Sequence, residues 1–378
     1  MGLGRKGREK MKKGDDLTPR QLWQNIMNYR TGEFDRMPVI HWMCWEETYD
    51  RWKSEGLPQH ISRLNGEHEY FNAHYQWSTI SCHLGPYPYF ETKIVEETDE
   101  YTVFWDGQGV LTKDFKHAES VPHYMDWTFK TADDWPRFKE RLQINAKRIP
   151  AGLDGQIARA EASGLPIVIF AGSMMGWVRD WMGVANMVYL MHDSPDCYAD
   201  IVDTLSDLVC WSIDQIVPRM STTVDMAHGW EDIAGSSGPF VSPAAFDQLV
   251  APGYRKIRTK LEEHGIGIYS IDSDGKVEPI IANWMAAGVN MQFPLQPGTW
   301  DCRPEAMRAK FGKDLLIQGG FDKMVLEQGR DAIDAEIERH IPLMKEGGFV
   351  MMPDHLITPG VPLDDYKYYI ERIRELRF

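Results

Sequence analysis

Short apolar runs alternate with longer segments of helical periodicity along most of this chain. Most positions within these runs are apolar, which is typical of strands that are buried on both faces of a parallel sheet. The clear runs are PVIHWMCW (38–45), PIVIFAG (166–172), TTVDMAHG (222–229), GIGIYSID (265–272), VNMQFPL (289–295), LLIQGG (315–320) and FVMMPD (349–354). The pattern therefore predicts seven strands of a parallel α/β sheet.

Helical segments with recognisable ends lie between these runs. The clearest cover residues 196–217, 243–260 and 279–287. Ser194 and Ser242 stand at N-cap positions before the first two segments, and Gly288 follows the third. Alternation of strands and helices with short connections predicts right-handed crossovers. One further strand, hidden in the pattern, would close the seven into a single (β/α)8 TIM barrel.

One segment breaks this alternation, between about residues 90 and 122. The residues on either side of Asp106-Gly107 alternate between polar and apolar, which predicts a β-hairpin excursion on the rim of the barrel. At the start of the chain, a basic run extends from Arg5 to Lys13. We therefore expect a flexible basic N-terminus over residues 1–20 and one barrel over residues 21–378.

Composition and charge narrow the class of protein. The chain has 41 Lys and Arg against 56 Asp and Glu, a net charge of −15, which argues against general binding to nucleic acid or anionic membranes. It shows no signal-peptide pattern and no apolar run of about 18 residues, so we expect a cytoplasmic protein. Five cysteines without CxxC spacing agree with a reduced compartment. Dinucleotide, P-loop and hydrolase-elbow motifs are missing from the sequence.

Polar side chains gather where the predicted strands end, which is where α/β barrels place their active sites. These residues are His228, Glu231 and Asp232, then Asp272 and Asp274, then Asp322 and Lys323, and finally Asp354 and His355. Carboxylates brought together repel one another, and a divalent metal relieves the repulsion; a set of carboxylates and imidazoles is compatible with zinc. Alternatively, the acids cap helices and His355 is a hydrogen-bonded loop histidine.

Five further positions are candidates for substrate contact. His41 and Trp45 belong to the first predicted strand, Met174 and Trp177 follow the second, and Asp354 follows the last. With 14 Trp and 20 Met, the chain can line a site for a flat apolar ligand, although most such side chains belong to cores. Burial statistics favour a hydrogen-bonded core position for His41. The glycines of GSMMG (172–176) suit either close approach to a ligand or a tight turn.

The sequence resembles the uroporphyrinogen decarboxylase superfamily over roughly residues 20–378. The motifs that carry the resemblance are, in order, TGEFDRMPV, IFAGSMMGWV, EDIAGSSGPFVSPAAFDQLVAPGYRKI, IDSDGKVEPII, GVNMQFPLQ, LLIQGGFDK and PDHLITPGVPLDDY. This resemblance implies a single (β/α)8 barrel, in agreement with the predicted strands.

Two chemistries occur in that superfamily, and the resemblance separates them by motif. True decarboxylases carry an arginine-rich MRQAGR segment after the first strand, where this chain has HWMCWEETYDRW, with Glu46 and Glu47. Cobamide-dependent methyltransferases bind zinc through a His-x-Cys-Gly segment and a later Pro-Gly-Cys turn. The corresponding places here hold Asp272-Ser273-Asp274-Gly275 and Pro353-Asp354-His355. The resemblance therefore implies Asp272, Asp274 and His355 as metal ligands.

The resemblance is closest to O-demethylase methyltransferases, and the harder ligand set suits an ether oxygen better than a thiol. It implies methyl transfer from a methoxylated aromatic compound to the cob(I)amide of a corrinoid-binding (cobalamin) partner protein, with zinc as the metal. Glu231 would be a fourth ligand or a catalytic base, and His228 and Asp354 would orient ligands or substrate. A homodimer stays open. The alternatives are another small methyl donor, a metal-free decarboxylase that uses Arg36, Arg51 or Arg179, and a non-catalytic binder.

Overall fold

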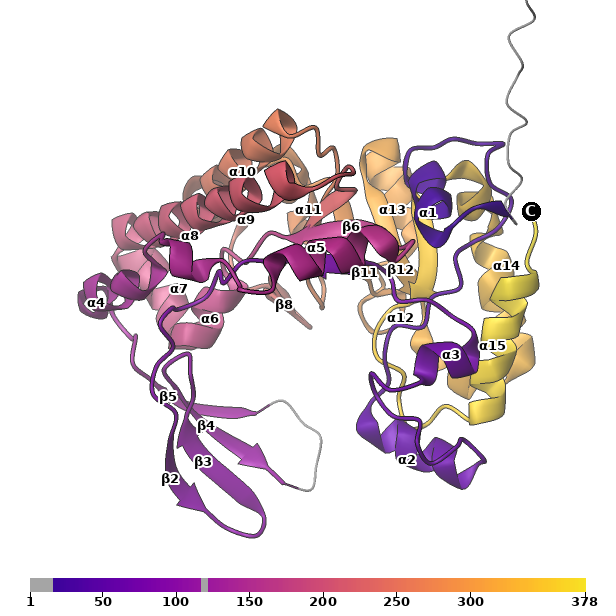
Figure 1. Ribbon diagram of the computed structural model, residues 1–378, viewed down its shortest axis with the longest axis horizontal. Coiled ribbons are helices and arrows are strands. Elements are labelled where there is room, and N and C mark those ends of the chain that lie inside the picture. Colours follow the sequence, from indigo (N-terminus) through magenta and orange to yellow (C-terminus); the bar gives the residue numbers. More distant parts are fainter. Residues whose placement is uncertain (1–15, 117–121) are drawn as a thin grey trace, which may run out of the picture.

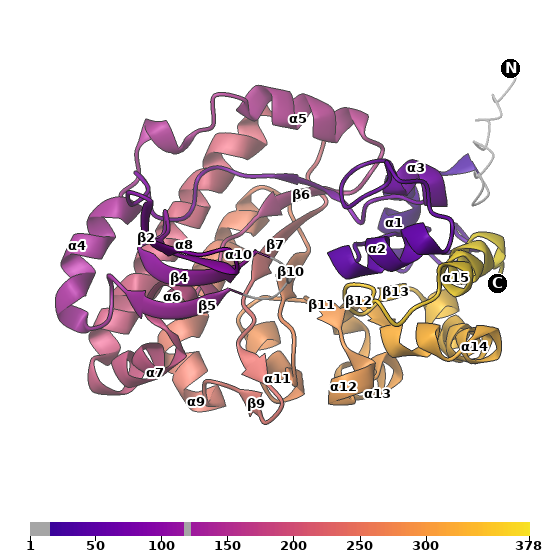
Figure 2. The same cartoon turned by 90° about the horizontal axis from the view of Figure 1, so that it is seen from below.

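Seven strands form one parallel sheet in the computed structural model, which describes residues 16–116 and 122–378. Their order is β1 (Ser78–Ile80), β6 (Ile167–Phe170), β7 (Met226–Trp230), β10 (Tyr269–Asp272), β11 (Met291–Leu295), β12 (Leu316–Phe321) and β13 (Phe349–Pro353). Six of these strands coincide with predicted runs, and β1 is the hidden strand. The curled sheet and its helices form the predicted α/β barrel (Figure 1, Figure 2).

The first predicted strand, residues 38–45, lies between the two edges of this sheet. It makes isolated parallel bridges instead of a continuous ladder: Ile40 pairs with His74, and Cys44 pairs with Ile357. His74 leads into β1, and Ile357 follows β13. The segment is therefore the eighth stave of the barrel, and it connects the two edge strands.

Helices cover the outer side of the sheet (Figure 2). They include α1 (Pro19–Met27), α5 (Leu153–Ala162), α7 (Val184–Asp193), α8 (Pro195–Ile216), α10 (Ala251–Glu263), α11 (Glu278–Ala286), α13 (Pro304–Phe311), α14 (Arg330–Glu346) and α15 (Leu363–Glu375). All three predicted helices are confirmed, and Ser242 caps the second through a hydrogen bond from the main-chain N–H of Ala245. None of the helices in the described ranges combines the length and apolarity that a membrane-spanning helix needs.

Two predicted features differ in detail from the structure. The helix predicted over 243–260 contains a short α9 (Pro243–Ala245) and a π-helical turn (Phe246–Val250) before α10, in which Pro252 has no N–H to donate. Of the N-terminus predicted to be flexible, residues 1–15 lie outside the described part. Pro19 and Arg20 already belong to α1, whose N-cap is Thr18.

The rim excursion is larger than the predicted hairpin. It is a four-stranded antiparallel sheet, here called the accessory sheet, made of β2 (Lys93–Glu97), β3 (Tyr101–Trp105), β4 (Val110–Phe115) and β5 (His123–Trp127). The predicted turn joins β3 to β4, and the Asp106 carboxylate accepts hydrogen bonds from the N–H groups of Gln108 and Val110. The accessory sheet projects from the same end of the barrel as α2 (Glu46–Ser54) (Figure 1).

Two tryptophan side chains attach the accessory sheet to α6 (Gly176–Met182). Trp127 donates from Nε1 to the carbonyl of Asp180 at 2.9 Å, and Trp181 donates to the side chain of Gln108 at 2.8 Å. Gly183, directly after α6, has a φ of +80°, and a Cβ there would lie 2.8 Å from the Trp127 ring. A glycine is therefore required at this junction.

A buried polar network holds the eighth stave to α3 (Glu67–Phe71) and α15. His41 and Glu67 are both 0% exposed. The His41 ring contacts the Glu67 carboxylate at 3.0 Å through Nε2 and the Tyr366 hydroxyl at 2.6 Å through Nδ1. Tyr49 also donates to Glu67. His41 therefore has no free ring nitrogen and no exposed surface. The hydrogen-bonded core position that burial statistics favour for it is confirmed, and the alternative of a substrate contact is wrong.

We expect Glu67→Ala to lower the free energy of unfolding by about 3–5 kcal/mol, because it leaves the buried His41 and Tyr49 without their acceptor. Burial raises the pKa of Glu67, but hydrogen bonds from His41 and Tyr49 hold it below its ordinary value overall. The stabilisation from ionised Glu67 is therefore complete above the unfolded pKa of about 4.3 and is lost as pH falls through the lower folded value.

Urea denaturation from pH 7 to pH 3 measures this effect. The matched control is Glu69→Ala, at an exposed position of the same helix, which should change stability by less than about 0.5 kcal/mol. Equal losses in the two variants would contradict the role of Glu67.

Candidate functional site

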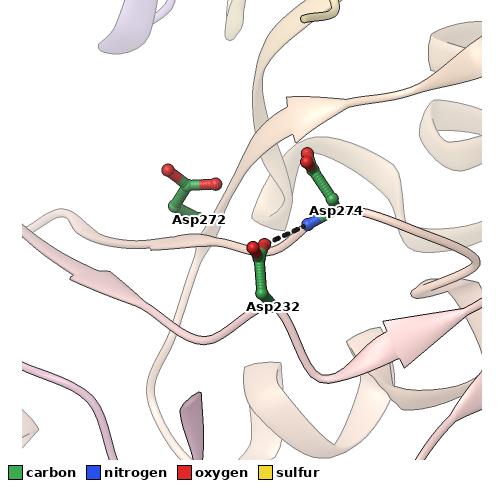
Figure 3. Close-up of side chains that lie close together, drawn as sticks. All are labelled: Asp232, Asp272 and Asp274. Carbon is green, nitrogen blue, oxygen red and sulfur yellow. Dashed lines mark hydrogen bonds between the residues drawn. The ribbon is translucent and has the colours of Figure 1, made fainter. Parts of the chain in front are cut away.

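Three aspartates meet at the carboxyl ends of neighbouring strands. Asp232 follows β7, Asp272 is the last residue of β10, and Asp274 follows two residues later. One carboxylate oxygen from each lies within 4.8 Å of the others (Figure 3). The main-chain N–H of Asp274 donates to the Asp232 carboxylate at 3.0 Å. Neither Asp272 nor Asp274 caps α11, whose N-cap is Val277, so the helix-cap alternative is wrong for these two acids. It is confirmed for Asp322, which caps the short helix Lys323–Glu327 by accepting a hydrogen bond from the main-chain N–H of Met324.

The electrostatics of this cluster favour a cation. Burial raises the pKa of Asp272 well above its ordinary value, and the charges of Asp232 and Asp274 raise it further. Burial and the charge of Asp274 also raise the pKa of Asp232. Ionised carboxylates at this distance repel one another, and a divalent ion among them would remove the repulsion.

Asp232 adopts a strained backbone conformation. Its φ is +46°, in the left-handed region that non-glycine residues rarely occupy. The guanidinium of Arg179, from α6, donates to the Asp232 carbonyl and pairs with the Asp180 carboxylate at 3.0 Å. It also lies over the Trp230 ring, 5.0 Å from its centroid. Arg179 thus holds the turn that directs the Asp232 carboxylate toward Asp272.

His355 lies beside the cluster, as the sequence predicts. Its Nε2 is 3.1 Å from the Asp274 carboxylate. Its Nδ1 is buried and has no hydrogen-bond partner among the described residues. The ring stacks on Trp45 at a centroid distance of 6.3 Å and contacts Trp42 edge to face at 6.0 Å. The structure therefore brings the three predicted metal ligands together and adds Asp232 to them.

Aromatic rings from several strands meet beside the carboxylates in the barrel interior. Phe293 of β11 contacts Trp42 at 5.2 Å and Trp77 at 4.8 Å. His228 of β7 contacts Trp77 at 4.7 Å and Phe293 at 5.4 Å. Phe293 is the register partner of Asp272, so both side chains point to the same face of the sheet. We call Trp42, Trp77, His228 and Phe293 the aromatic wall; it adjoins the carboxylates.

Glu231 occupies a different place from the one predicted. It is 0% exposed, and its carboxylate points to the first turn of α6. Five donors surround it: the main-chain N–H groups of Met174, Met175 and Gly176, and the hydroxyls of Ser173 and Tyr254. A carboxylate whose oxygens are already shared among five donors is neither a metal ligand nor a base, so both predicted roles are wrong. It anchors α6 instead.

This anchor also explains the second glycine of GSMMG. A Cβ on Gly176 would lie 2.2 Å from the carbonyl oxygen of Glu231, so the close approach is to the protein itself. Met174 is 1% exposed, and its sulfur lies on the side of Gly253 in α10. Trp177 packs on Trp181 and Phe170, both at 5.7 Å. The structure does not bring Met174 or Trp177 to the aromatic wall.

Asp354 lies next to His355 and joins two turns of the site. It is 4% exposed, and its carboxylate accepts a hydrogen bond from the main-chain N–H of Lys323 at 3.1 Å. Burial raises its pKa to about 6. This bond ties the turn after β12 to the turn that carries His355, which is a positioning role.

Four residues of the site carried too little signal for prediction. The sequence places Asp232 among the strand-end acids, but it predicts a ligand or base role for the neighbouring Glu231 and none for Asp232. Trp42, Trp77 and Phe293 are ordinary core residues by pattern, and no motif separates them from the other aromatic residues. Alternation along an extended segment sends Glu231 and Asp232 to opposite sides, and this alternation was the one available signal for Asp232.

Comparison with known proteins agrees with the barrel and its motifs. A family model described as uroporphyrinogen decarboxylase (URO-D) matches residues 112–376. The chain belongs to this family. Curated relatives include uroporphyrinogen decarboxylases of Pseudomonas aeruginosa (strain LESB58), 25% identical over 236 residues, and of Geobacter sulfurreducens, 22% identical over 259 residues. The first alignment covers 58% of this chain and 61% of the relative.

Among solved structures, a methyltransferase from Methanosarcina mazei has the same fold as this URO-D family chain. The TM-score is 0.59 at 14% identity, and the alignment covers 95% of this chain and 99% of the other. At this level of identity the similarity concerns the fold.

We expect Glu231→Gln to lower the free energy of unfolding by about 2–3 kcal/mol. All five neighbours donate hydrogen bonds, and the new amide NH2 would face donors where the carboxylate accepted. Thermal or urea denaturation measures the loss. Glu338→Gln, at an exposed position of α14, is the matched control and should unfold like the wild type. If both variants unfold alike, Glu231 does not anchor α6.

Proposed function

We propose that this URO-D family chain is a metal-dependent methyltransferase. It would take a methyl group from a methoxylated aromatic compound and pass it to the cob(I)amide of a corrinoid-binding partner protein. The methyl–oxygen bond breaks, the cobalt(I) electron pair forms the new bond to the methyl carbon, and the phenolate leaves and takes up a proton. The observation that carries the proposal is the cluster of Asp232, Asp272, Asp274 and His355 beside aromatic rings at the barrel mouth.

The donor set fits a divalent metal. Three carboxylates and one imidazole match the ligand preferences of zinc, and harder ions such as Mn²⁺ also accept carboxylates. The buried Nδ1 of His355 has no partner in the described chain, and burial together with the charges of Asp232 and Asp274 raises the pKa of Asp272. Asp232, Asp272, Asp274 and His355 would hold the ion, which when bound would draw electron density from the ether oxygen and make the phenolate a better leaving group.

The surrounding residues would keep this arrangement rigid. Arg179 fixes the turn of Asp232, and Asp354 fixes the turn of His355. Trp42, Trp45 and Phe293 present rings next to the carboxylates, where an aromatic donor could stack. The proposal therefore assigns the donor and the metal to adjacent positions of one site, with the mouth of the barrel left for the corrinoid.

A metal-free decarboxylase is the second candidate, because the curated relatives carry that name. The charges at the mouth argue against it, since a polyacidic substrate would meet three aspartates. Of the three arginines that could oppose them, Arg51 pairs with Glu55 at 2.7 Å and Arg179 pairs with Asp180. Arg36 precedes the eighth stave and lines a 220 Å³ cavity at the opposite end of the barrel.

The test combines metal analysis with turnover. We expect the protein, purified without added metal, to contain close to one equivalent of zinc or another divalent metal. It should demethylate methoxyarenes with chemically reduced cob(I)alamin as the methyl acceptor. The change in the absorption spectrum of the cobalamin measures this reaction. Asp272→Asn should weaken metal affinity by at least about tenfold, as even the loss of an outer partner of a metal ligand does.

Asp154→Asn, whose side chain is 91% exposed on α5, is the control and should bind metal normally. Carbon dioxide release from uroporphyrinogen by metal-free protein, without methyl transfer, would overturn the proposal in favour of the decarboxylase.

A further inference from the structure

The side chains in the barrel interior form layers that differ in charge. Asp272 belongs to the outer layer at the mouth. Ser270 lies two residues earlier on β10, on the same face, and its register partner on β7 is His228. At the rise of about 3.3 Å per strand residue, this second layer lies roughly 7 Å deeper than the carboxylates. A small ring that reaches the carboxylates with one end would therefore reach His228 with the other.

The deeper layer is uncharged. His228 is 8% exposed, and burial alone, without a nearby charge, lowers its pKa to about 3, so the ring stays neutral at physiological pH. Its described neighbours are the aromatic rings of Trp77 and Phe293 and the hydroxyl of Ser270, which is 3.2 Å from Nδ1.

His228 has one ring nitrogen to offer. Nδ1 is engaged with Ser270, and no described residue forms a hydrogen bond with Nε2. A neutral imidazole whose Nδ1 accepts from the serine hydroxyl carries its proton on Nε2, and in the other tautomer Nε2 accepts. In either tautomer Nε2 matches a phenolic hydroxyl, which both donates and accepts. It does not match a carboxylate, which would be buried there without a positive partner.

The geometry points to the class of donor, and we infer that the site prefers methoxyarenes with an uncharged hydroxyl opposite the methoxyl group over those with a carboxylate there. This inference rests on the proposed function, because it takes the methoxyl end of the donor to lie at the carboxylates. Trp77 and Phe293 contact each other at 4.8 Å, so the donor ring would pack against this pair and not between its members. His228 would contact the far substituent of the donor. The outer layer adds to the discrimination, because three aspartates around one divalent ion leave a net charge of −1, which repels an anion.

Three donors that differ in one substituent test the inference: 4-methoxyphenol, methoxybenzene and 4-methoxybenzoate. Isothermal titration of the zinc-loaded protein without corrinoid gives Kd, and turnover with cob(I)alamin gives kcat/KM. We expect both to follow that order, with 4-methoxyphenol at least about tenfold better than 4-methoxybenzoate, a ratio equal to about 1.4 kcal/mol. Equal or tighter binding of 4-methoxybenzoate, or no binding of any of the three, would overturn the inference.

Substitution at His228 separates recognition from a merely structural role. His228→Leu should remove most of the preference for 4-methoxyphenol over methoxybenzene, and His228→Gln, which keeps a polar group, should retain part of it. An equal loss for both ligands in His228→Leu would overturn the role of His228. If the binding order holds but no methoxyarene is demethylated, the inference about the ring site stands and the proposed methyl transfer fails.

Discussion

The site depends on one buried carboxylate that takes no part in its chemistry. Glu231 gathers five donors from the first turn of α6 and from α10, and so fixes the end of β7 against both helices. α6 in turn supplies Arg179, which returns to bind the carbonyl of the next residue, Asp232. The end of β7 and α6 therefore stabilise each other, and together they fix the orientation of the Asp232 carboxylate. Since the accessory sheet is attached through Trp127 and Trp181 to the same helix, it shares this anchor.

Two opposing electrostatic environments lie in sequence along the barrel axis. The outer layer concentrates negative charge where burial already makes charge costly, and this combination invites a cation. The layer beneath it has rings and a neutral imidazole, and this combination excludes ions. Parallel strands allow such close layering, because side chains two residues apart point to the same face. Under the proposed function, a ligand that spans both layers would combine an oxygen that binds the metal with an apolar body.

The sequence predicted most of the barrel, and the exceptions have physical causes. Uniform apolar runs mark strands covered on both faces, which is why β6, β7 and β10 to β13 were visible. β1 was hidden because it has three residues, of which Ser78 and Thr79 are polar. β2 is exposed at all five positions, so burial imposes no pattern on it, and the accessory sheet was expected as a hairpin.

The candidate site was predictable where strand ends determine it and not where long-range contacts do. The strand ends place Asp272, Asp274 and His355 among the candidates, and the family resemblance selects these three as metal ligands. The sequence leaves both a substrate contact and a core position open for His41, because its partners, Glu67 and Tyr366, stand 26 and 325 residues away. The choice between Glu231 and Asp232 depended on which of two adjacent carboxylates faces the interior. Hydropathy does not distinguish two neighbouring acids, and the donors around Glu231 come from segments far apart in the chain.

The left-handed backbone of Asp232 sets stability against function at a single residue. Glycine would adopt this conformation without strain, so selection for a more stable fold alone would favour its replacement. A chain that keeps aspartate there retains a carboxylate at a cost of about 1–3 kcal/mol in conformational strain. The residue at this turn would therefore distinguish members of a family that share the barrel. Aspartate would indicate that the negative charge is still used, and glycine would indicate that it has been replaced by a more stable backbone.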